Sequence, residues 1–249
     1  MLAAAACSSG PQPGAPSSAP PGDAAPRNTA PIRVLMLTAT EGFRHDSIPT
    51  AIDVMARFAS SPGDITVTST GQVSSITAAS LAGYDVLFFA LTSGELPFTA
   101  EQKTAILTFV NTGRGFIGVH SATDTLYEWP EYGRLVGGYY LHHPWTQQAT
   151  VIVEDRSHPS TRDLGESFSI LDEFYTFRDN PRLLNVQVLL RLDPGSVGAS
   201  GGDYPLAWAQ TVGSGRAYYN ALGHFPGTWN DPRFQQQLVG AIRWVASRN

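Results

Sequence analysis

Five of the six histidines in this chain lie in short polar segments that follow or adjoin apolar runs. The five are His45, His120, His142, His143 and His224. At neutral pH an imidazole can either transfer a proton or bind a metal ion. If these segments meet in space, the residue types therefore predict an acid–base centre or a site for a divalent ion such as zinc. The sixth histidine, His158 in "RSHPS", is expected to be a loop residue outside such a site.

The stretch "GRGFIGVHSATD" is the most informative of these segments. Its apolar part predicts a buried strand over 115–119, and the strand ends on His120 and Ser121. Ligands of open α/β sheets bind beyond the carboxyl ends of the strands, where such bends lie. We therefore expect His120 at the centre of the site, with Asp124 orienting its ring.

A pair of carboxylates, Asp172 and Glu173, lies between apolar residues in "SILDEFYTF". A carboxylate pinned among aromatic side chains is partly desolvated, which raises its pKa and suits acid–base work. Glu173 is predicted as the general base and Asp172 as the residue behind it. A solvated turn is the alternative reading of this pair.

The elements that must position these residues alternate between strands and helices. Continuous apolar runs at 32–40, 84–91 and 115–119 are typical of buried parallel strands. Helices are expected from Asp46 or Ser47 onward, from the capping box "TAEQ" at 99–102 to Val110, and after Asp231-Pro232. Further strands are expected at 65–70, 149–154 and 186–191, and a pair of strands around the Gly-Ser-Gly turn within 205–222. The pattern predicts one α/β domain over 32–249, a three-layer, doubly wound, mostly parallel sheet.

The first 31 residues have a different character. Cys7, the only cysteine, ends a run of small apolar residues and precedes a Pro/Ser/Ala-rich stretch. This arrangement resembles a bacterial lipoprotein signal, so we expect an exported protein lipidated at Cys7, with residues 8–31 as a disordered tether. The net charge of −5 gives no reason to expect nucleic acid as a partner. No run approaches the roughly 20 apolar residues that span a bilayer, so membrane association is expected only through the lipid.

Several motifs together resemble the ThuA-like (trehalose utilisation) family. In chain order they are "GFRHDSI", "GRGFIGVHSATD", "GGYYLHHPW", "DEFYTF" and "GRAYYNALGHFPGTWNDPRF". The resemblance implies the fold of class I glutamine amidotransferases, which is flavodoxin-like and carries a cysteine nucleophile at the bend after a strand. Those enzymes also carry a histidine after a later strand. In this sequence His120 and Ser121 stand at the bend, and His224 matches the histidine after the later strand. Glutamine amidotransfer is not expected, because no cysteine stands at that bend to form the acyl-enzyme, and Cys7 lies in the leader.

The resemblance further implies a role in carbohydrate metabolism, with a 3-keto glycoside or related sugar as the small-molecule substrate. Hydrolysis, elimination or isomerisation of such a sugar needs a base, an acid and positive charge near the enolate oxygen. His120 and His224 are expected as metal ligands or as an acid–base pair, with His143 as a further metal ligand, and no nucleotide cofactor is expected. The residues expected to contact the sugar are Arg44, His45, Ser121, Tyr140, His143, Trp145 and Trp229.

Two other functions stay open at this point. The aromatic segments could hold a glycan without altering it, as a non-catalytic carbohydrate-binding domain of an exported sugar-utilisation system. Alternatively, Ser121 could act as a nucleophile with His224 as its base, although its setting V-H-S-A-T departs from the G-x-S-x-G elbow.

Overall fold

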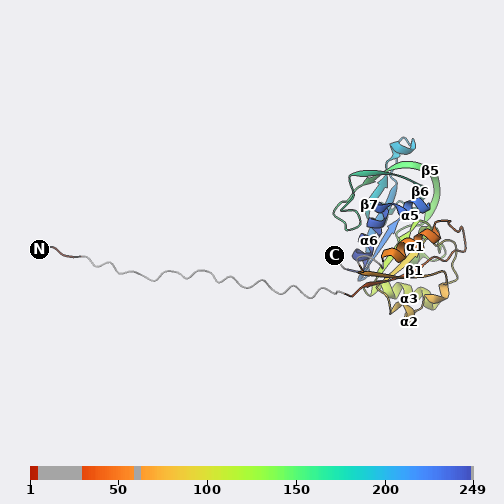
Figure 1. Ribbon diagram of the computed structural model, residues 1–249, viewed down its shortest axis with the longest axis horizontal. Helices are drawn as coiled ribbons and strands as arrows, with labels where there is room; N and C mark the ends of the chain where they lie inside the picture. Colours follow the sequence, from red (N-terminus) through yellow and green to blue (C-terminus); the bar gives the residue numbers. More distant parts are fainter. Residues whose placement is uncertain (5–29, 59–62, 248–249) are drawn as a thin grey trace.

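The computed structural model describes residues 1–4, 30–58 and 63–247 (Figure 1). Cys7 and most of the expected tether lie outside the described residues. From residue 30 onward the described chain folds around one nine-stranded sheet of order β2-β1-β3-β4-β9-β8-β7-β5-β6. The strands are β1 (Ile32–Leu37), β2 (Ile65–Thr70), β3 (Val86–Ala90), β4 (Gly115–Val119), β5 (Tyr140–Val153), β6 (Ser167–Phe177), β7 (Gln187–Leu192), β8 (Pro205–Val212) and β9 (Gly215–Asn220).

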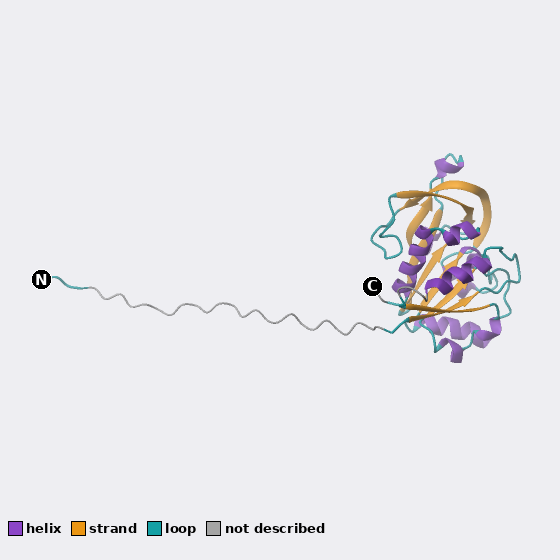
Figure 2. Cartoon of the chain, in the orientation of Figure 1, coloured by secondary structure: helices purple, strands orange, loops and turns teal. Residues whose placement is uncertain are grey.

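Helices cover both faces of this sheet, as expected for a three-layer α/β fold (Figure 2). They are α1 (Ile48–Phe58), α2 (Ala78–Leu81), α3 (Ala100–Asn111), α4 (Pro130–Val136), α5 (Pro226–Asn230) and α6 (Pro232–Val245). Short 3-10 turns lie at η1 (Val73–Ser75), η2 (His120–Thr123), η3 (Pro181–Leu184) and η4 (Pro194–Val197). Within β4, Gly115 packs against Val245 of α6, whereas Gly118 packs against Val136 of α4. The two layers therefore approach β4 closely, and at Gly115 they leave no room for a Cβ, which would lie 2.6 Å from a methyl group of Val245.

The parallel half of the sheet agrees with the sequence prediction. Strands β2, β1, β3, β4 and β9 run parallel to one another. Every residue of β3 and β4 is buried, because helices cover both faces and leave no polar side of the strand. The predicted capping box is also present, with Thr99 accepting a hydrogen bond from the backbone N–H of Gln102 at the start of α3.

The antiparallel half differs from the prediction at two segments. The expected hairpin of β8 and β9 is present. However, "GGYYLHHPW" and "LDEFY", for which no strand was predicted, lie largely within the long antiparallel pair β5 and β6. The physical reason is visible in β6, where Phe168, Ile170, Asp172 and Phe174 alternate as one face of a strand.

None of the described helices is both long and apolar enough to cross a membrane.

The packing of α6 generates a stability prediction. A Cβ added at Gly240 in α6 would lie 2.3 Å from the carbonyl oxygen of Pro159, a rigid backbone atom. We expect Gly240→Ala to lower the free energy of unfolding by about 1–3 kcal/mol, because the loop must move away from the helix. Gly227→Ala in α5 is the matched control, since its Cβ would meet nothing within 4 Å. Urea denaturation of both variants measures the difference, and equal stabilities would contradict this account of the α6 packing.

Candidate functional site: a histidine–glutamate cluster

Three histidines and one glutamate from four distant segments converge in the structure. They are His45, His120, Glu173 and His224, and one ligand atom from each lies within 4.8 Å of those of the others. His45 lies in the loop after β1, His120 follows β4, and His224 follows β9. Because these parallel strands end at the same edge of the sheet, the three imidazoles meet there. Glu173 reaches the same place from β6.

Three polar atoms of the cluster, from His120, His224 and Glu173, are nearly equidistant. Glu173 Oε2 lies 3.4 Å from His120 Nε2 and 3.3 Å from His224 Nδ1. The two imidazole nitrogens are themselves 3.3 Å apart. These three atoms, together with a ring nitrogen of His45, could hold a metal ion.

The ring of His120 is fixed by the backbone beside it. Its Nδ1 lies 2.7 Å from the carbonyl oxygen of Ala221, so Nδ1–H donates and Nε2 faces the cluster. The hydroxyl of Tyr175 lies 3.0 Å from Nε2. The backbone of His120 has φ 53°, a left-handed conformation that costs energy in a non-glycine residue. Tyr219 stabilises it by donating a hydrogen bond to the His120 carbonyl oxygen at 2.7 Å.

The electrostatics of the cluster depend on Glu173. Burial acts to raise the pKa of Glu173, but its contacts with His120 and His224 outweigh burial and hold the pKa well below its usual range. In turn, burial disfavours protonation of His224, yet the contact with Glu173 raises its pKa. Burial, together with the neighbouring His120 and His224, lowers the pKa of His45 to about 3, so this ring is neutral at pH 7. Glu173 is therefore an ionised anchor for the imidazoles, and a poor proton acceptor.

The sequence had suggested that Asp172 lies behind Glu173 in the same site, but the structure places Asp172 elsewhere. Adjacent residues of a strand point to opposite faces, and Asp172 is fully buried on the other face of β6. Its carboxylate accepts hydrogen bonds from the backbone N–H groups of Gly223 and His224 at 2.8 and 3.0 Å, and from the Thr228 hydroxyl at 2.8 Å. Burial raises the pKa of Asp172, and these hydrogen bonds oppose that rise. Asp172 thus holds the loop that carries His224.

His143 approaches the cluster from its solvent side. Its Nδ1 lies 3.2 Å from Glu173 Oε1, and its side chain is 48% exposed. The sequence had suggested His143 as a metal ligand. In the structure, the group of four residues that could hold a metal ion contains His45 and not His143. The neighbouring His142 contacts the hydroxyl of Thr176. Tyr140 flanks the site as expected, with its ring 4.5 Å from Tyr175 and 6.1 Å from His143.

Three residues expected at the site make their contacts elsewhere. Trp229 is fully buried, donates a hydrogen bond to the Gly223 carbonyl and packs on Phe234. Trp145 packs on Tyr204. Asp124 was expected to orient His120, but its carboxylate accepts a hydrogen bond from Tyr127 at 2.7 Å.

Ser121 and Arg44 were also expected to contact the sugar, and their surroundings differ. Ser121 is buried beside the cluster, with its hydroxyl 3.5 Å from Nδ1 of His45, and this is not the Ser121–His224 pair that a serine hydrolase of the expected kind needs. Arg44 is exposed in the loop that carries His45.

The sequence analysis missed two groups that shape the site, Tyr175 and the Ala221 carbonyl. The spacing of Tyr175, two residues after Glu173, could have revealed the first, because alternate residues of a strand share a face. A backbone carbonyl leaves no signal in the residue types, so the second could not have been found.

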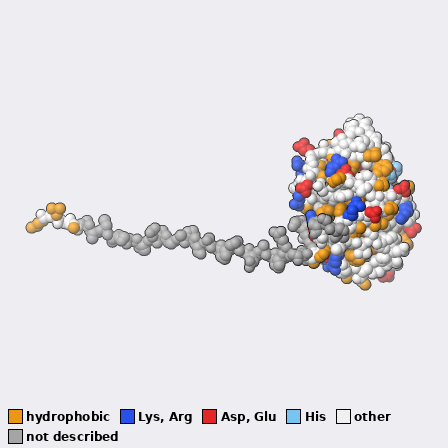
Figure 3. All heavy atoms as spheres, viewed as in Figure 1, with side chains coloured by type: hydrophobic (Ala, Val, Ile, Leu, Met, Phe, Trp, Pro, Cys, Tyr) orange, Lys and Arg blue, Asp and Glu red, His pale blue; other side chains and the backbone are white. Residues whose placement is uncertain are grey.

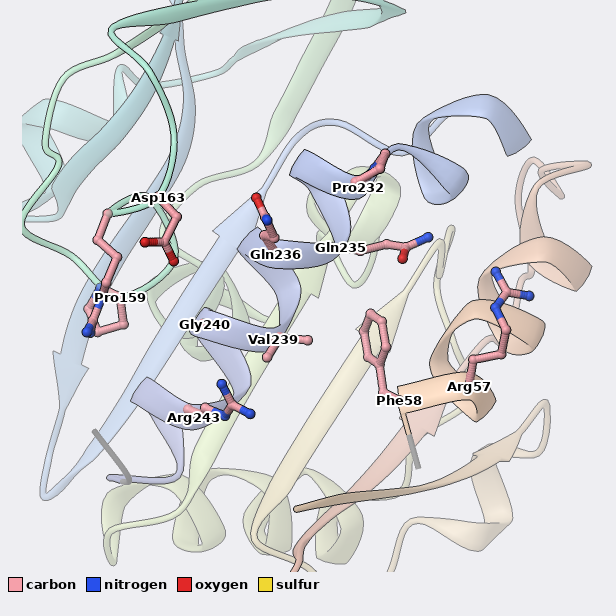
Figure 4. A pocket seen from close by; sticks show the side chains of 11 residues that line it. Arg57, Phe58, Pro159, Asp163, Pro232, Gln235, Gln236, Val239, Gly240 and Arg243 are labelled. Carbon is pink, nitrogen blue, oxygen red and sulfur yellow. The ribbon is translucent and has the colours of Figure 1, made fainter. Parts of the chain in front are cut away.

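Figure 4 shows a pocket of about 590 Å³ that is lined by none of the cluster residues. Its lining comes mainly from α6 and from residues 159–163, with Arg57 and Phe58 of α1 beside them, and Arg57 and Arg243 do not converge on one point. On the face drawn in Figure 3, acidic and basic side chains are interspersed, without a large patch of one sign.

Comparison with known proteins agrees with this architecture. The family model for ThuA, described as trehalose utilisation, matches residues 33–245. A protein described as ThuA-like from Bacteroides uniformis has a similar structure, with a TM-score of 0.75 and 25% identity over 90% of this chain and 95% of that one. Another from Parabacteroides merdae has a TM-score of 0.71 and 19% identity over 87% of this chain and 90% of that one.

The fold also occurs inside larger enzymes. A β-galactosidase from Bacillus circulans has a TM-score of 0.57 and 13% identity over 88% of this chain, but only 31% of the galactosidase. At this identity the likeness shows the fold alone. Among curated proteins none matches this chain. The match of the family model over most of the chain, together with the two ThuA-like structures, shows that this protein belongs to the ThuA (trehalose utilisation) family.

Proposed function

We propose that this protein is a carbohydrate-processing enzyme that acts on a 3-keto glycoside or a related sugar, by hydrolysis, elimination or isomerisation. Family membership supports the carbohydrate part of this proposal. The observation that carries the catalytic part is the convergence of His45, His120, His224 and Glu173. A domain that only binds a glycan has little use for three buried or half-buried imidazoles arranged around one carboxylate.

A divalent ion, zinc or a similar metal, fits the donor atoms of this cluster. Three imidazole nitrogens and one carboxylate oxygen are the ligand types that zinc binds in proteins. In a tetrahedral site with metal–ligand bonds of about 2.0–2.1 Å, the ligand atoms lie about 3.3–3.4 Å from one another. The distances among His120, His224 and Glu173 are 3.3, 3.3 and 3.4 Å. The hydrogen bond from Nδ1 of His120 to a carbonyl is also the usual support for a metal-binding imidazole.

The chemistry of a 3-keto sugar defines what the other residues must do. The ketone at C3 acidifies the hydrogen at C2. When a base removes that proton, the electron pair of the C–H bond forms an enediolate. The bond from C1 to the glycosidic oxygen then breaks, and that oxygen takes up a proton. Water adds to C1 in hydrolysis, whereas isomerisation returns a proton to the same enediolate. A bound divalent ion would supply positive charge for the enolate oxygen.

His143 is the proposed proton-transfer residue. Its Nδ1 lies 3.2 Å from Glu173 Oε1, a contact that favours the tautomer with the proton on Nδ1 and leaves the lone pair of Nε2 to accept a proton. The half-exposed position of its side chain leaves room for a substrate to reach it. Glu173, which the sequence suggested as the base, instead anchors His143 on one oxygen and the buried imidazoles on the other.

The remaining proposals concern location and partners. We propose a small sugar or glycoside as the partner, and an exported protein held at the cell envelope by a lipid on Cys7. Mass spectrometry of the N-terminal peptide from the membrane fraction of a bacterial host tests the lipid, and an unmodified Cys7 in that fraction would contradict it.

The first prediction from the proposed site concerns the metal content of the purified protein. We expect about one equivalent of a divalent metal in the wild-type protein, and its loss in His120→Ala and His224→Ala, because each removes a ligand. His142→Ala is the matched control, since that ring contacts Thr176 and lies outside the cluster. Elemental analysis after dialysis against zinc gives the measurement. Equal metal content in all four proteins would contradict the metal site.

The second prediction separates proton transfer from metal binding. We expect His143→Ala to keep its metal but to turn over 3-keto-trehalose about 10²- to 10⁴-fold more slowly, as loss of a general acid–base residue commonly does. Glu173→Gln should lose both metal and turnover, because Glu173 contacts both groups. His142→Ala and Glu166→Gln, an exposed carboxylate away from the cluster, serve as controls. A His143→Ala protein that works at the wild-type rate would remove this residue from the mechanism, and wild-type protein that binds the sugar without forming product would favour a carbohydrate-binding domain.

A further inference from the structure

An exposed phenylalanine stands beside the buried polar cluster. Phe43 is 64% exposed, although burial of so large an apolar side chain is the norm. Its ring contacts that of His45 edge to face, at 4.8 Å between centroids. An exposed large apolar group in this position needs an explanation.

The exposure of Phe43 is built into the backbone around it. The carbonyl oxygen of Phe43 accepts a hydrogen bond of 2.7 Å from the hydroxyl of Ser93. The backbone N–H of Glu41 donates to the carbonyl oxygen of Ser93 at 2.9 Å, and Gly42 packs tightly against Gly94. The loop is therefore tied to the segment after β3, and the ring is held out of the core.

A second phenylalanine, Phe225, contacts another histidine of the cluster. The ring of Phe225 lies 4.5 Å from that of His224, again edge to face, and is half-buried. Its carbonyl oxygen accepts a hydrogen bond from the backbone N–H of Thr228 at 3.0 Å, which fixes it at the start of α5. His45 and His224 are themselves in ring contact at 5.2 Å. Phe43, His45, His224 and Phe225 therefore form an unbroken series of rings, with apolar rings at its two ends.

We propose that Phe43 and Phe225 form an aromatic wall that packs against the apolar C–H face of the sugar while the cluster acts on its polar edge. This inference rests on the proposed carbohydrate function and adds the residues that select its substrate class, a pyranose ring. A pyranose carries hydroxyl groups around its edge and hydrogens bonded to carbon on its faces, so one molecule can satisfy both surfaces. Small-molecule sites generally combine such aromatic walls with a few converging polar groups. The wall takes over the stacking role that the sequence had suggested for Trp145 and Trp229, which pack on Tyr204 and Phe234.

The test compares sugar affinity in wall variants whose metal content is measured in parallel. We expect Phe43→Ala and Phe225→Ala to raise the KM for 3-keto-trehalose and the Kd for trehalose about three- to tenfold, as loss of one aromatic contact typically does. Each ring packs on a histidine of the cluster, so an unchanged metal content is the check that a rise in KM or Kd reflects loss of the sugar contact. Phe43→Tyr and Phe225→Tyr keep a ring in place and should restore affinity. Leu183→Ala, which removes an 83% exposed apolar side chain on η3, is the control for loss of surface hydrocarbon.

The outcomes separate this inference from the proposed function. If the wild-type protein binds trehalose but does not convert the keto sugar, and the alanine variants bind more weakly, the wall is supported and the enzymatic proposal fails. If the wild-type protein converts the keto sugar and both alanine variants match it in KM and Kd, the wall is overturned and the enzymatic proposal stands. A wild-type protein that binds neither sugar would overturn both.

Discussion

The parallel pairing of β4 with β9 determines where the histidines meet. In this register Val119 lies opposite Asn220, so the two strands end side by side. The next residues are His120 and Ala221, and the carbonyl of Ala221 accepts the hydrogen bond that orients the His120 ring. His224 follows three residues later and comes within 3.3 Å of that ring. A shift of register by one residue would move the carbonyl away and turn the imidazoles apart.

The antiparallel half of the sheet supplies the charge that this arrangement needs. Strand β6 presents Glu173 and Tyr175 to the imidazoles, and Asp172 to the opposite face. One carboxylate therefore binds the rings directly, while the other holds the backbone of the loop that carries His224. Two adjacent acidic residues have distinct roles because the strand sends their side chains to opposite faces. The site therefore lies where the two halves of the sheet meet. The parallel half positions the imidazoles, and the antiparallel half positions the Glu173 carboxylate.

The sequence was most informative where local patterns determine structure. Apolar runs such as 115–119 predicted the buried parallel strands, and the rule that such strands end at one edge predicted that His120 and His224 lie close together. The family followed from five motifs and is confirmed by the family model. The pair β5 and β6 was harder to predict, because its register contains irregularities between Tyr140 and Trp145 that depend on the partner strand. Trp229 was misread for a similar reason, since its burial depends on α5 folding back over the Gly223 carbonyl and Phe234.

The proposed metal centre consists of these imidazoles and Glu173. Anomalous diffraction from crystals of the full chain grown with zinc tests it most directly. We expect one strong peak between His120, His224 and Glu173, with His45 completing the ligands. A map without a peak there, at zinc concentrations that fill ordinary surface sites, would contradict it, and the cluster would then have to be explained by hydrogen bonds alone.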